Sequence, residues 1–177
     1  MDTTPLLNEQ EIAHTLNELA ARILERHDEN GLVMLVGIQR RGADIAGRLA
    51  RLIEARVGRP PALGTLDINL YRDDWTSVEG KPHIGQSSIP GNVADKVIIL
   101  VDDVLFSGRT ARAALEALLD YGRPKAVELL VLIDRGHREL PIQADYVGRA
   151  VSTSLSEHVD VLLNERDGKD AVLVSRA

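Results

Sequence analysis

The chain has 177 residues, a formal net charge of −6 at pH 7 and no cysteine. The absence of cysteine excludes thiol catalysis, disulfide bonds and cysteine-ligated metal clusters, and the acidic balance argues against binding nucleic acid through bulk positive potential. A chain of this length can bury one core without a structural metal, so we expect residues 1–177 to form a single domain. The first residues lack a basic and apolar leader, and no window approaches 18 consecutive apolar residues, so we expect a cytoplasmic protein with no membrane span.

The first third of the chain predicts a helix followed by a strand, a turn and a second helix. Apolar residues spaced three and four apart within residues 8–29 predict an amphipathic helix. The apolar run 32–38 has the length of a strand, and helical spacing resumes over residues 45–57. This order is typical of an α/β fold with a parallel sheet.

The turn after this strand contains Arg40, Arg41 and Gly42. Two arginines in a turn are often ordinary solvated residues. A turn at the carboxyl edge of a parallel sheet, however, faces the ligand crevice. Arginine binds phosphate oxygens in pairs, and glycine lets the backbone approach an anion closely. We therefore predict an anion-binding turn here.

The segment from residue 63 to residue 95 changes character along its length. Alternating apolar and polar residues predict a strand over residues 63–70, which leads into the polar residues 71–74. Residues 76–95 are rich in glycine, proline and serine and show no periodicity. Connections this long inside a compact domain are often lids. We predict a mobile loop, formed as a hairpin, that closes over a reacting centre.

The most informative stretch is residues 97–110. The apolar run 97–101 predicts a buried parallel strand, and Asp102, Asp103 and a Ser-Gly-x-Thr turn separate it from a helix predicted over residues 111–121. Backbone N–H groups at a helix start bind phosphate, and carboxylates accept hydrogen bonds from sugar hydroxyls. The pattern therefore predicts a phosphate site beside two acids.

Competing signatures are absent or fit poorly. The sequence contains no G-x-x-x-x-G-K-[ST], no G-x-G-x-x-G after a strand and no G-x-S-x-G, which argues against a P-loop NTPase, a dinucleotide fold and a nucleophile elbow. A glycosidase pair is disfavoured because neighbouring strand residues, here Asp102 and Asp103, should point to opposite faces.

The last third predicts more strands. The apolar run 126–133 has strand length and ends in the charged residues 134–139. Short strands and a closing hairpin are predicted between residues 146 and 174. Charged residues thus follow a predicted parallel strand for the third time, so we expect three strand ends to contribute to one site.

Residues 97–110 resemble the motif with which type I phosphoribosyltransferases bind 5-phosphoribosyl 1-diphosphate (PRPP): a hydrophobic strand, two acids and Ser-Gly-x-Thr. Residues 66–74, 101–112 and 134–146 are also similar to the PyrR family, and this similarity covers residues 9–165. Members of that family are uracil phosphoribosyltransferases and uridine-nucleotide-responsive, RNA-binding attenuators of pyrimidine operons. The resemblance implies a type I phosphoribosyltransferase fold: an α/β domain whose central, mostly parallel sheet is flanked by helices, with a small C-terminal hood and a flexible loop.

The resemblance implies roles for the residues of the central motif. Asp102 and Asp103 would be the catalytic acids, holding the ribose 2′ and 3′ hydroxyls and balancing charge that develops on the ring. The 5′-phosphate of PRPP or UMP would be bound by Ser107, Gly108, Arg109 and Thr110.

The remaining substrate groups receive residues in the same way. The resemblance implies that Arg40, Arg41 and Gly42 bind pyrophosphate and that uracil lies under the hood around residues 153–163. Mg²⁺ would be held by diphosphate and ribose oxygens, with no direct protein ligand. The flexible loop that would close over PRPP begins with Tyr71, Arg72, Asp73 and Asp74.

The resemblance also implies a pyrimidine-operon mRNA leader as a partner and a homodimer or higher homo-oligomer. The RNA-binding pattern of the family is matched by His137, Arg138 and Arg149. Four positions depart from it, where the family often has Thr, His, Arg and Lys: Asn17, Ala21, Gln143 and Leu155. Each missing phosphate contact weakens RNA affinity.

Three functions stay open at this point. The first is a uracil phosphoribosyltransferase that also regulates pyrimidine operons in response to UMP or UTP. The second is an RNA-binding attenuator with only vestigial catalysis. The third is a phosphoribosyltransferase for another base, such as hypoxanthine or orotate, because the sequence does not identify the hood residues that contact the base.

Overall fold

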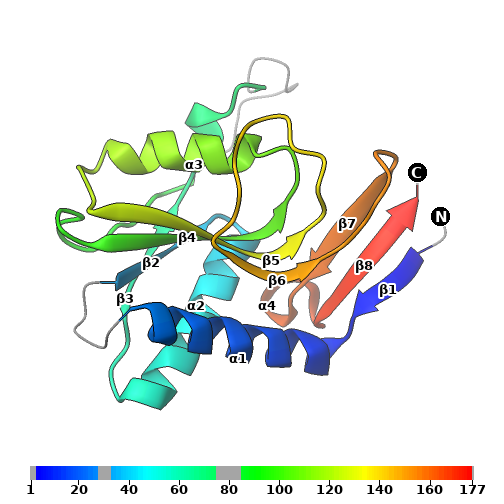
Figure 1. Cartoon of the computed structure of the whole chain (residues 1–177), viewed down its shortest axis with the longest axis horizontal. Coiled ribbons are helices and arrows are strands. Elements are labelled where there is room, and N and C mark those ends of the chain that lie inside the picture. Colours follow the sequence, from blue (N-terminus) through cyan, green and yellow to red (C-terminus); the bar gives the residue numbers. More distant parts are fainter. Residues whose placement is uncertain (1–2, 28–32, 75–84, 177) are drawn as a thin grey trace.

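The computed structural model describes residues 3–27, 33–74 and 85–176. Its main sheet has five strands, all parallel (Figure 1). In spatial order they are β3 (Ala62–Leu66), β2 (Val33–Ile38), β4 (Val97–Leu105), β5 (Ala126–Asp134) and β6 (Tyr146–Ala150). The predicted α/β fold with a parallel sheet is confirmed.

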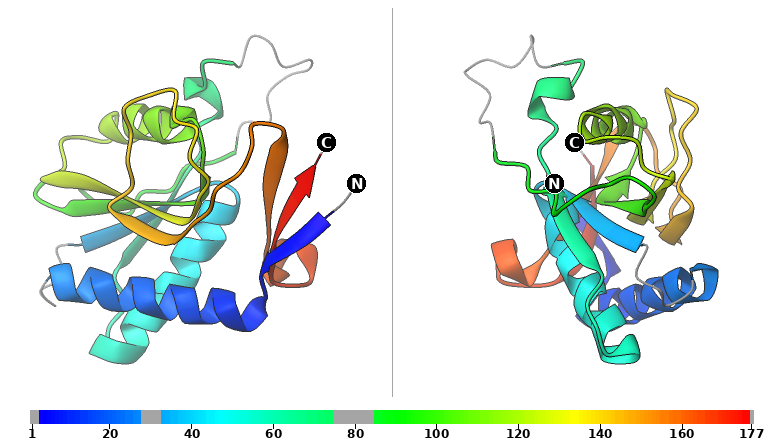
Figure 2. Two further views of the ribbon diagram at one scale, coloured as in Figure 1. Left: turned by 45° about the vertical axis from the view of Figure 1, so that its right-hand side comes forward. Right: turned by 90° about the vertical axis from the view of Figure 1, so that its left-hand side faces the viewer.

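Helices cover both faces of this sheet (Figures 1 and 2). Helices α1 (Glu9–Arg26) and α2 (Arg41–Val57) lie on one face, and α3 (Arg109–Leu119) lies on the other. Side chains of the strands alternate between the two core layers. Leu35 and Ile99 pack under α1 and α2, whereas Met34 and Ile98 pack under α3. This double coverage explains why the central strands read as continuous apolar runs.

Helix α1 begins where its sequence predicts. The Asn8 side chain accepts a hydrogen bond from the N–H of Glu11 at 2.9 Å, and the Glu11 carboxylate accepts one from the N–H of Asn8 at 2.8 Å. This capping box satisfies two N–H groups that a helix start leaves unpaired. The apolar stripe of the helix, from Ile12 to Ile23, is buried. None of the described helices has the length and hydropathy needed to cross a membrane.

Strand β3 is shorter than predicted. It ends at Leu66, and residues 69–71 form the short 3-10 helix η1 (Asn69–Tyr71), so the prediction of a strand to Leu70 is wrong. The Asp67 carboxylate accepts a hydrogen bond from the N–H of Asn69 at 2.8 Å. Such an aspartate turn competes with the strand ladder and ends it.

A second, antiparallel sheet forms the hood beside the main sheet (Figure 2). Its order is β1 (Thr3–Leu7), β8 (Ala171–Arg176) and β7 (Glu157–Leu162). Strands β7 and β8 are the predicted closing hairpin, joined through the one-turn helix α4 (Asn164–Asp167). Strand β1 was not predicted, because five residues next to a terminus carry too little pattern.

A charged side chain is buried between the main sheet and the end of α1. Glu128 of β5 is only 7% exposed. Its carboxylate accepts a hydrogen bond from the Tyr146 hydroxyl at 2.7 Å, contacts His27 Nε2 at 2.9 Å and pairs with Arg26 Nε at 3.1 Å. Burial and the neighbouring carboxylate raise the pKa of Tyr146. The hydroxyl therefore stays protonated and donates to Glu128.

Replacing Glu128 with alanine should lower the free energy of unfolding by about 2 kcal/mol, because the buried Tyr146 hydroxyl loses its carboxylate acceptor and Arg26 loses one of its two carboxylate partners. Urea denaturation measures the difference. Glu116→Ala is the matched control, since it removes an exposed ion pair with Arg112 and should cost about 0.5 kcal/mol or less. Equal losses in the two variants would show that the buried cluster has no special role.

Candidate active site

The two predicted acids lie near the carboxyl edge of the main sheet, inside strand β4. The strand continues past them to Leu105. Each carboxylate folds back on the chain: Asp102 accepts a hydrogen bond from the N–H of Asp103, and Asp103 accepts one from the N–H of Val104, both at 2.9 Å. These bonds fix both side chains along the strand.

The part of β4 that carries the two acids stays in register with β5, with Asp102 beside Val131 and Val104 beside Ile133. Val101 and Leu100, which precede the acids, belong to the two different core layers. The orientation expected for the two carboxyl groups, and with it the argument against a glycosidase pair, stays a prediction.

The surroundings of Asp102 disfavour its negative charge. Burial raises the pKa of this carboxyl well above its usual range, and the charge of Asp103 and the hydrogen bond between the two groups raise it further. Hydroxyl donors or a cation at this position would stabilise the ionised form. The pair is thus suited to a ligand rich in hydroxyl groups.

The predicted phosphate cradle follows β4 directly. Gly108 has a φ of 91°, in the left-handed region that glycine adopts without strain, and α3 begins at the next residue. The Ser107 carbonyl accepts hydrogen bonds from the N–H groups of Glu139 and Leu140, at 2.9 and 3.1 Å. The cap residue Gly108 has no side chain, the Arg109 N–H donates to the Ser107 hydroxyl oxygen at 3.3 Å, and Thr110 is exposed. The first N–H groups of a helix lack intrahelical partners, so this turn can bind a phosphate.

The Arg109 side chain is held by two carboxylates of the protein. Its guanidinium donates to Glu139 at 2.6 Å and to Asp73 at 2.5 Å. Beside it, Arg112 donates to the Tyr71 carbonyl at 2.6 Å, and Arg72 pairs with a neighbouring carboxylate. The predicted loop residues Tyr71, Arg72, Asp73 and Asp74 therefore lie against the start of α3, while residues 75–84 of that loop are outside the described part of the chain.

The chain re-enters the described region at the anion-binding turn. The Asp67 carboxylate accepts a hydrogen bond from the N–H of Gly85, and the Gln39 side chain donates to the Gln86 carbonyl at 2.9 Å. Ser88 and Thr65 then form an antiparallel bridge at the edge of β3. The described residues before the loop therefore contact the start of α3, and those after the loop contact Gln39 and β3.

Gly42 places the anion-binding turn directly against β4. A Cβ atom at this position would lie 2.3 Å from the Val101 carbonyl oxygen and 3.1 Å from the Asp102 α-carbon. Only glycine fits this contact. The turn, which contains a cis peptide between Gln39 and Arg40, is thereby held next to the acid pair.

The two arginines of the turn have different surroundings. Arg40 is exposed, whereas Arg41 donates to the Asp167 carboxylate at 3.1 Å. The Nε atom of Arg41 is buried and has no hydrogen-bond partner among the described residues. Buried donors are rarely left unpaired, so this N–H is suited to an oxygen of a bound anion.

A buried arginine marks the opposite end of the site. Arg135, only 5% exposed, stacks on the Phe106 ring with its guanidinium carbon 4.2 Å from the ring centroid. It donates to the Thr153 hydroxyl at 3.2 Å and the Ser154 carbonyl at 3.0 Å. Burial lowers the pKa of this guanidinium. These contacts attach the segment that enters the hood to the end of β5.

Two of the three residues assigned to RNA are also part of this end. His137 Nε2 lies 2.6 Å from the Thr153 carbonyl oxygen. Arg138 binds the Asp134 carboxylate at 2.5 Å and the Phe106 carbonyl at 2.9 Å. Arg149, in contrast, lies exposed on β6 and donates to a carbonyl of β1 at 3.2 Å.

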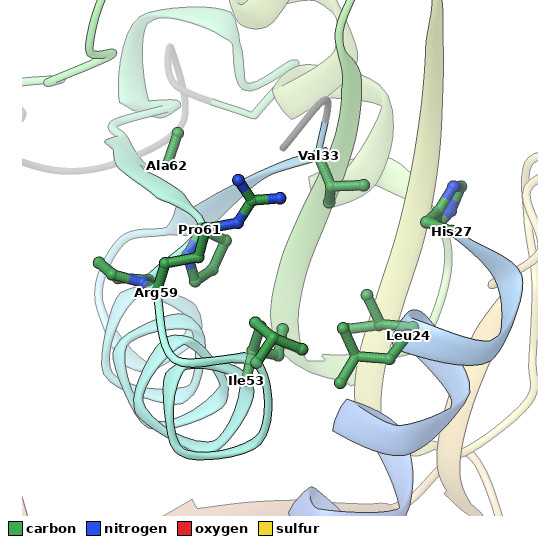
Figure 3. Close-up of a pocket in the computed structure, with 10 residues that line it drawn as sticks. Leu24, His27, Val33, Ile53, Arg59, Pro61 and Ala62 are labelled. Carbon is green, nitrogen blue, oxygen red and sulfur yellow. The ribbon is translucent and has the colours of Figure 1, made fainter. Parts of the chain in front are cut away.

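A separate pocket lies at the other edge of the main sheet, where β2 and β3 begin (Figure 3). It has a volume of about 280 Å³ and is lined mainly by apolar side chains, among them Leu24, Ile53 and Pro61. Its polar residues are His27, which already binds Glu128, and Arg59. Converging polar groups are found at the carboxyl edge instead, and open α/β sheets bind ligands there.

No metal site is built from protein side chains alone in residues 3–27, 33–74 and 85–176, because no three histidine, aspartate or glutamate residues come together there. The acid pair offers carboxyl oxygens at the site. A hard cation such as Mg²⁺ prefers oxygen ligands and often keeps substrate phosphates and water in its shell. The acid pair fits such a cation if the substrate supplies most of the ligands.

Several contributors could not be found from the sequence. The stacking of Phe106 on Arg135, the anchoring of Gly85 by Asp67 and the pairing of Arg41 with Asp167 join residues 18 to 126 positions apart. No local pattern indicates such contacts. The three strand ends themselves were predicted correctly as neighbours.

Comparisons with known proteins agree with this geometry. Residues 2–173 match the family model of the phosphoribosyl transferase domain. The chain is 53% identical to a protein named Bifunctional protein PyrR of Alkaliphilus metalliredigens over 169 residues, covering 96% of this chain and 93% of the relative. It is 49% identical to the protein of the same name of Thermus thermophilus, covering 94% of this chain and 92% of the relative.

Solved structures show the same fold at lower identity. A hypoxanthine-guanine phosphoribosyltransferase of Bacillus anthracis superimposes with a TM-score of 0.71 at 17% identity, covering 98% of both chains. The hypoxanthine phosphoribosyltransferase of Trypanosoma cruzi in complex with its product IMP superimposes with a TM-score of 0.71 at 18% identity, covering 97% of this chain and 89% of the other.

Gly42→Ala should abolish anion binding at the turn, because the new methyl group must push the turn away from β4. Calorimetric titration with Mg²⁺ pyrophosphate measures this, and we expect no detectable heat. Gly47→Ala on the same helix is the control: nothing lies within 4 Å of its added Cβ, so binding should be unchanged and the helix slightly more stable. Pyrophosphate binding by the folded Gly42 variant would contradict the assignment.

Asp102→Asn should stabilise the protein at pH 7. The folded-state pKa of Asp102 lies above its unfolded value, so the native protein binds the extra proton, and wild-type stability falls as pH rises between the two values. The variant lacks this titration. The free energy of unfolding of Asp102→Asn should exceed that of the wild type by an amount that grows with pH, by up to about 1.4 kcal/mol per pH unit in that window. The difference should vanish near pH 3. Parallel pH profiles from urea denaturation would refute the raised pKa.

Proposed function

We propose that this chain, which belongs to the PyrR family of phosphoribosyltransferases, converts uracil and PRPP to UMP and pyrophosphate. The observation that carries the proposal is the contact of Gly42 with Val101, because it brings an anion-binding turn to an acid pair that is followed at once by a phosphate cradle. PRPP has these three groups in this order: a diphosphate, a ribose with two hydroxyls and a 5′-phosphate.

In this proposal the acid pair binds the ribose. The hydroxyls at C2′ and C3′ donate to Asp102 and Asp103, which stabilises carboxylates that are otherwise poorly solvated. When the bond from C1′ to the diphosphate breaks, positive charge develops on the ring. The adjacent carboxylates stabilise that charge more strongly than they stabilise the neutral ground state.

The two phosphate groups bind on either side of the ribose. The 5′-phosphate accepts hydrogen bonds from N–H groups of Gly108, Arg109 and Thr110 and from the Ser107 hydroxyl. The leaving diphosphate binds at Arg40, Arg41 and Gly42, where the unpaired Nε of Arg41 supplies a donor. Asp102 and Asp103 would help to hold a Mg²⁺ ion bound mainly by substrate oxygens and water, and the ion would supply positive charge that neutralises the diphosphate.

Uracil binds at the end formed by Phe106, Arg135 and the entry to the hood. The Phe106 ring and the buried guanidinium of Arg135 provide a flat wall, and Arg135 attaches the segment that enters the hood at Thr153 and Ser154 beside it. Uracil is proposed from PyrR relatives that share about half of this sequence. The predicted closure of the loop over PRPP depends on residues 75–84, outside the described chain, and stays a prediction.

A substrate panel tests the reaction. With PRPP and Mg²⁺, the purified protein should form UMP from uracil and no nucleotide from hypoxanthine or orotate. Asp103→Asn should lower kcat/KM by about 10²–10³-fold, because it removes charge that stabilises the transition state. Glu116→Gln, an isosteric loss of one exposed carboxylate, should leave it unchanged. A folded protein that forms IMP rather than UMP would support the alternative base.

A second function follows from the relatives, whose name describes them as bifunctional. We propose that a pyrimidine-operon mRNA leader binds at the surface around Arg149 and that UMP or UTP at the active site modulates this binding. His137 and Arg138 are half-buried and bind groups of the protein, whereas Arg149 is exposed and donates one hydrogen bond to the Leu6 carbonyl, so Arg149 is the best placed of the three residues. The Asn17 side-chain amide donates a hydrogen bond to the Ala13 carbonyl of the same helix, α1, at 3.0 Å.

Filter binding with the organism's own pyrimidine leader, with and without UMP, tests this function. Arg149→Ala should weaken binding and reduce the slope of log affinity against log salt by about 1. Arg123→Ala removes one exposed cation beyond the end of α3 and should have no effect. Equally weak binding of the leader and of a scrambled RNA would eliminate RNA regulation and leave catalysis as the function.

A further inference from the structure

The one-turn helix α4 of the hood faces the first two turns of α2 with complementary charges. Arg41, Asp44 and Arg48 are spaced i, i+3 and i+7, so they lie on one face of α2. Three consecutive residues of α4 meet them in reverse order: Asp167 pairs with Arg41, Arg166 with Asp44, and Glu165 with Arg48. We name these six residues the hood clamp.

The pairing in the hood clamp is specific in register. Along α2 the charges run positive, negative, positive, and the facing residues of α4 run negative, positive, negative. Displacing α4 by one residue would place like charges together. Arg48 is the strongest contact, with hydrogen bonds of 2.8 and 2.5 Å to Glu165 and of 2.6 and 2.8 Å to Asp170. This arginine attaches the hood to α2.

The other two pairs reach the anion-binding turn itself. The Arg166 guanidinium binds the Asp44 carboxylate and also donates to the Arg40 carbonyl at 3.4 Å. Asp167 holds the Arg41 guanidinium at 3.1 and 3.3 Å. Asp167 is itself fixed, because it accepts a hydrogen bond from the N–H of Leu163 at 2.8 Å. Two residues of the hood therefore contact two successive residues of the turn.

The hood clamp can do more than stabilise the fold. The cap residue of α2, Arg40, makes no capping hydrogen bond with its side chain, so the turn lacks the usual local support at a helix start. Support comes from Gly42 against β4 on one side and from α4 on the other. Removing the contacts of α4 leaves the backbone of the turn and the Arg41 side chain free to change orientation.

We propose that Arg166 and Asp167 are positioning residues for pyrophosphate: from the hood, they orient the backbone of Arg40 and the side chain of Arg41 toward the diphosphate of PRPP. This inference rests on the proposed function for the identity of the ligand. Neither residue is assigned a contact with the substrate. Their effect on binding passes through the turn, as it does when outer partners orient the groups that touch a ligand.

Kinetics separate positioning from general stability. Asp167→Asn and Arg166→Gln should each raise KM for PRPP about tenfold, with KM for uracil and the melting temperature close to wild type. Arg176→Gln, which removes the ion pair of an exposed arginine with Glu157 elsewhere in the hood, should leave both KM values unchanged. A rise in KM for uracil equal to that for PRPP in the Asp167 and Arg166 variants would overturn the positioning role.

Charge exchange gives a second test that loss of folding cannot mimic. Asp44→Arg alone should weaken PRPP binding, and the double variant Asp44→Arg with Arg166→Asp should recover most of it, because the pair forms again with its charges reversed. No recovery in a folded double variant would contradict the clamp. If Asp167→Asn fails to fold, the two KM values of Arg166→Gln still test the positioning role.

Titration with Mg²⁺ pyrophosphate, followed by calorimetry, separates this inference from the proposed reaction. About tenfold weaker pyrophosphate binding by Asp167→Asn and Arg166→Gln supports the clamp even if the wild type forms no UMP, in which case only the reaction is wrong. Wild-type affinity for pyrophosphate in both variants overturns the clamp even if UMP is formed. A wild type that binds neither pyrophosphate nor PRPP overturns the clamp together with the reaction.

Discussion

The close contact between Gly42 and the backbone of β4 determines how this site is built. A side chain at residue 42 would collide with the Val101 carbonyl, and one at Gly37 would lie 2.3 Å from the Ala43 α-carbon. Two positions without a Cβ atom therefore let the start of α2 lie directly on β2 and β4. This packing brings the anion-binding turn next to Asp102, and the side chains of the hood clamp support the turn from the other side. The phosphate cradle does not depend on a contact between distant residues, because the chain passes directly from β4 through Gly108 into α3.

The acid pair is locally unfavourable for the stability of the fold, and a binding function explains why it is present. Five apolar residues place Asp102 and Asp103 at the edge of a buried strand, where burial and the neighbouring charge of Asp103 raise the pKa of Asp102. A locally unfavourable arrangement of this kind persists at functional sites because the rest of the structure is stable enough to hold it in place. Ribose hydroxyls and a magnesium-bound diphosphate would supply the donors and the positive charge that the protein leaves out. The same logic applies to the buried Nε of Arg41, which lacks an acceptor in the described chain. Both features are explained by a ligand that has hydroxyl groups next to an anion.

The sequence predicts those parts of the structure that depend on local periodicity. The main strands, the three long helices, the closing hairpin and the neighbourhood of three strand ends were all predicted, because buried strands and amphipathic helices have characteristic patterns. Errors arose where a side chain overrides the pattern. Asp67 ends β3 early by accepting a hydrogen bond from the N–H of Asn69. Side chains that bind partners far away in the sequence were beyond prediction: Arg109 binds the Glu139 carboxylate, Arg138 binds the Phe106 carbonyl, and α4 pairs with α2 across more than 100 residues.

The arrangement of three strand ends around one substrate is the central claim, and a crystal structure with UMP and Mg²⁺ pyrophosphate tests it most directly. We predict the 5′-phosphate at the N–H groups of residues 108–110, the ribose hydroxyls on Asp102 and Asp103, the base beside Phe106 and Arg135, and pyrophosphate at Arg40–Gly42. Density for UMP away from the acid pair, or for pyrophosphate away from the turn, would contradict the account.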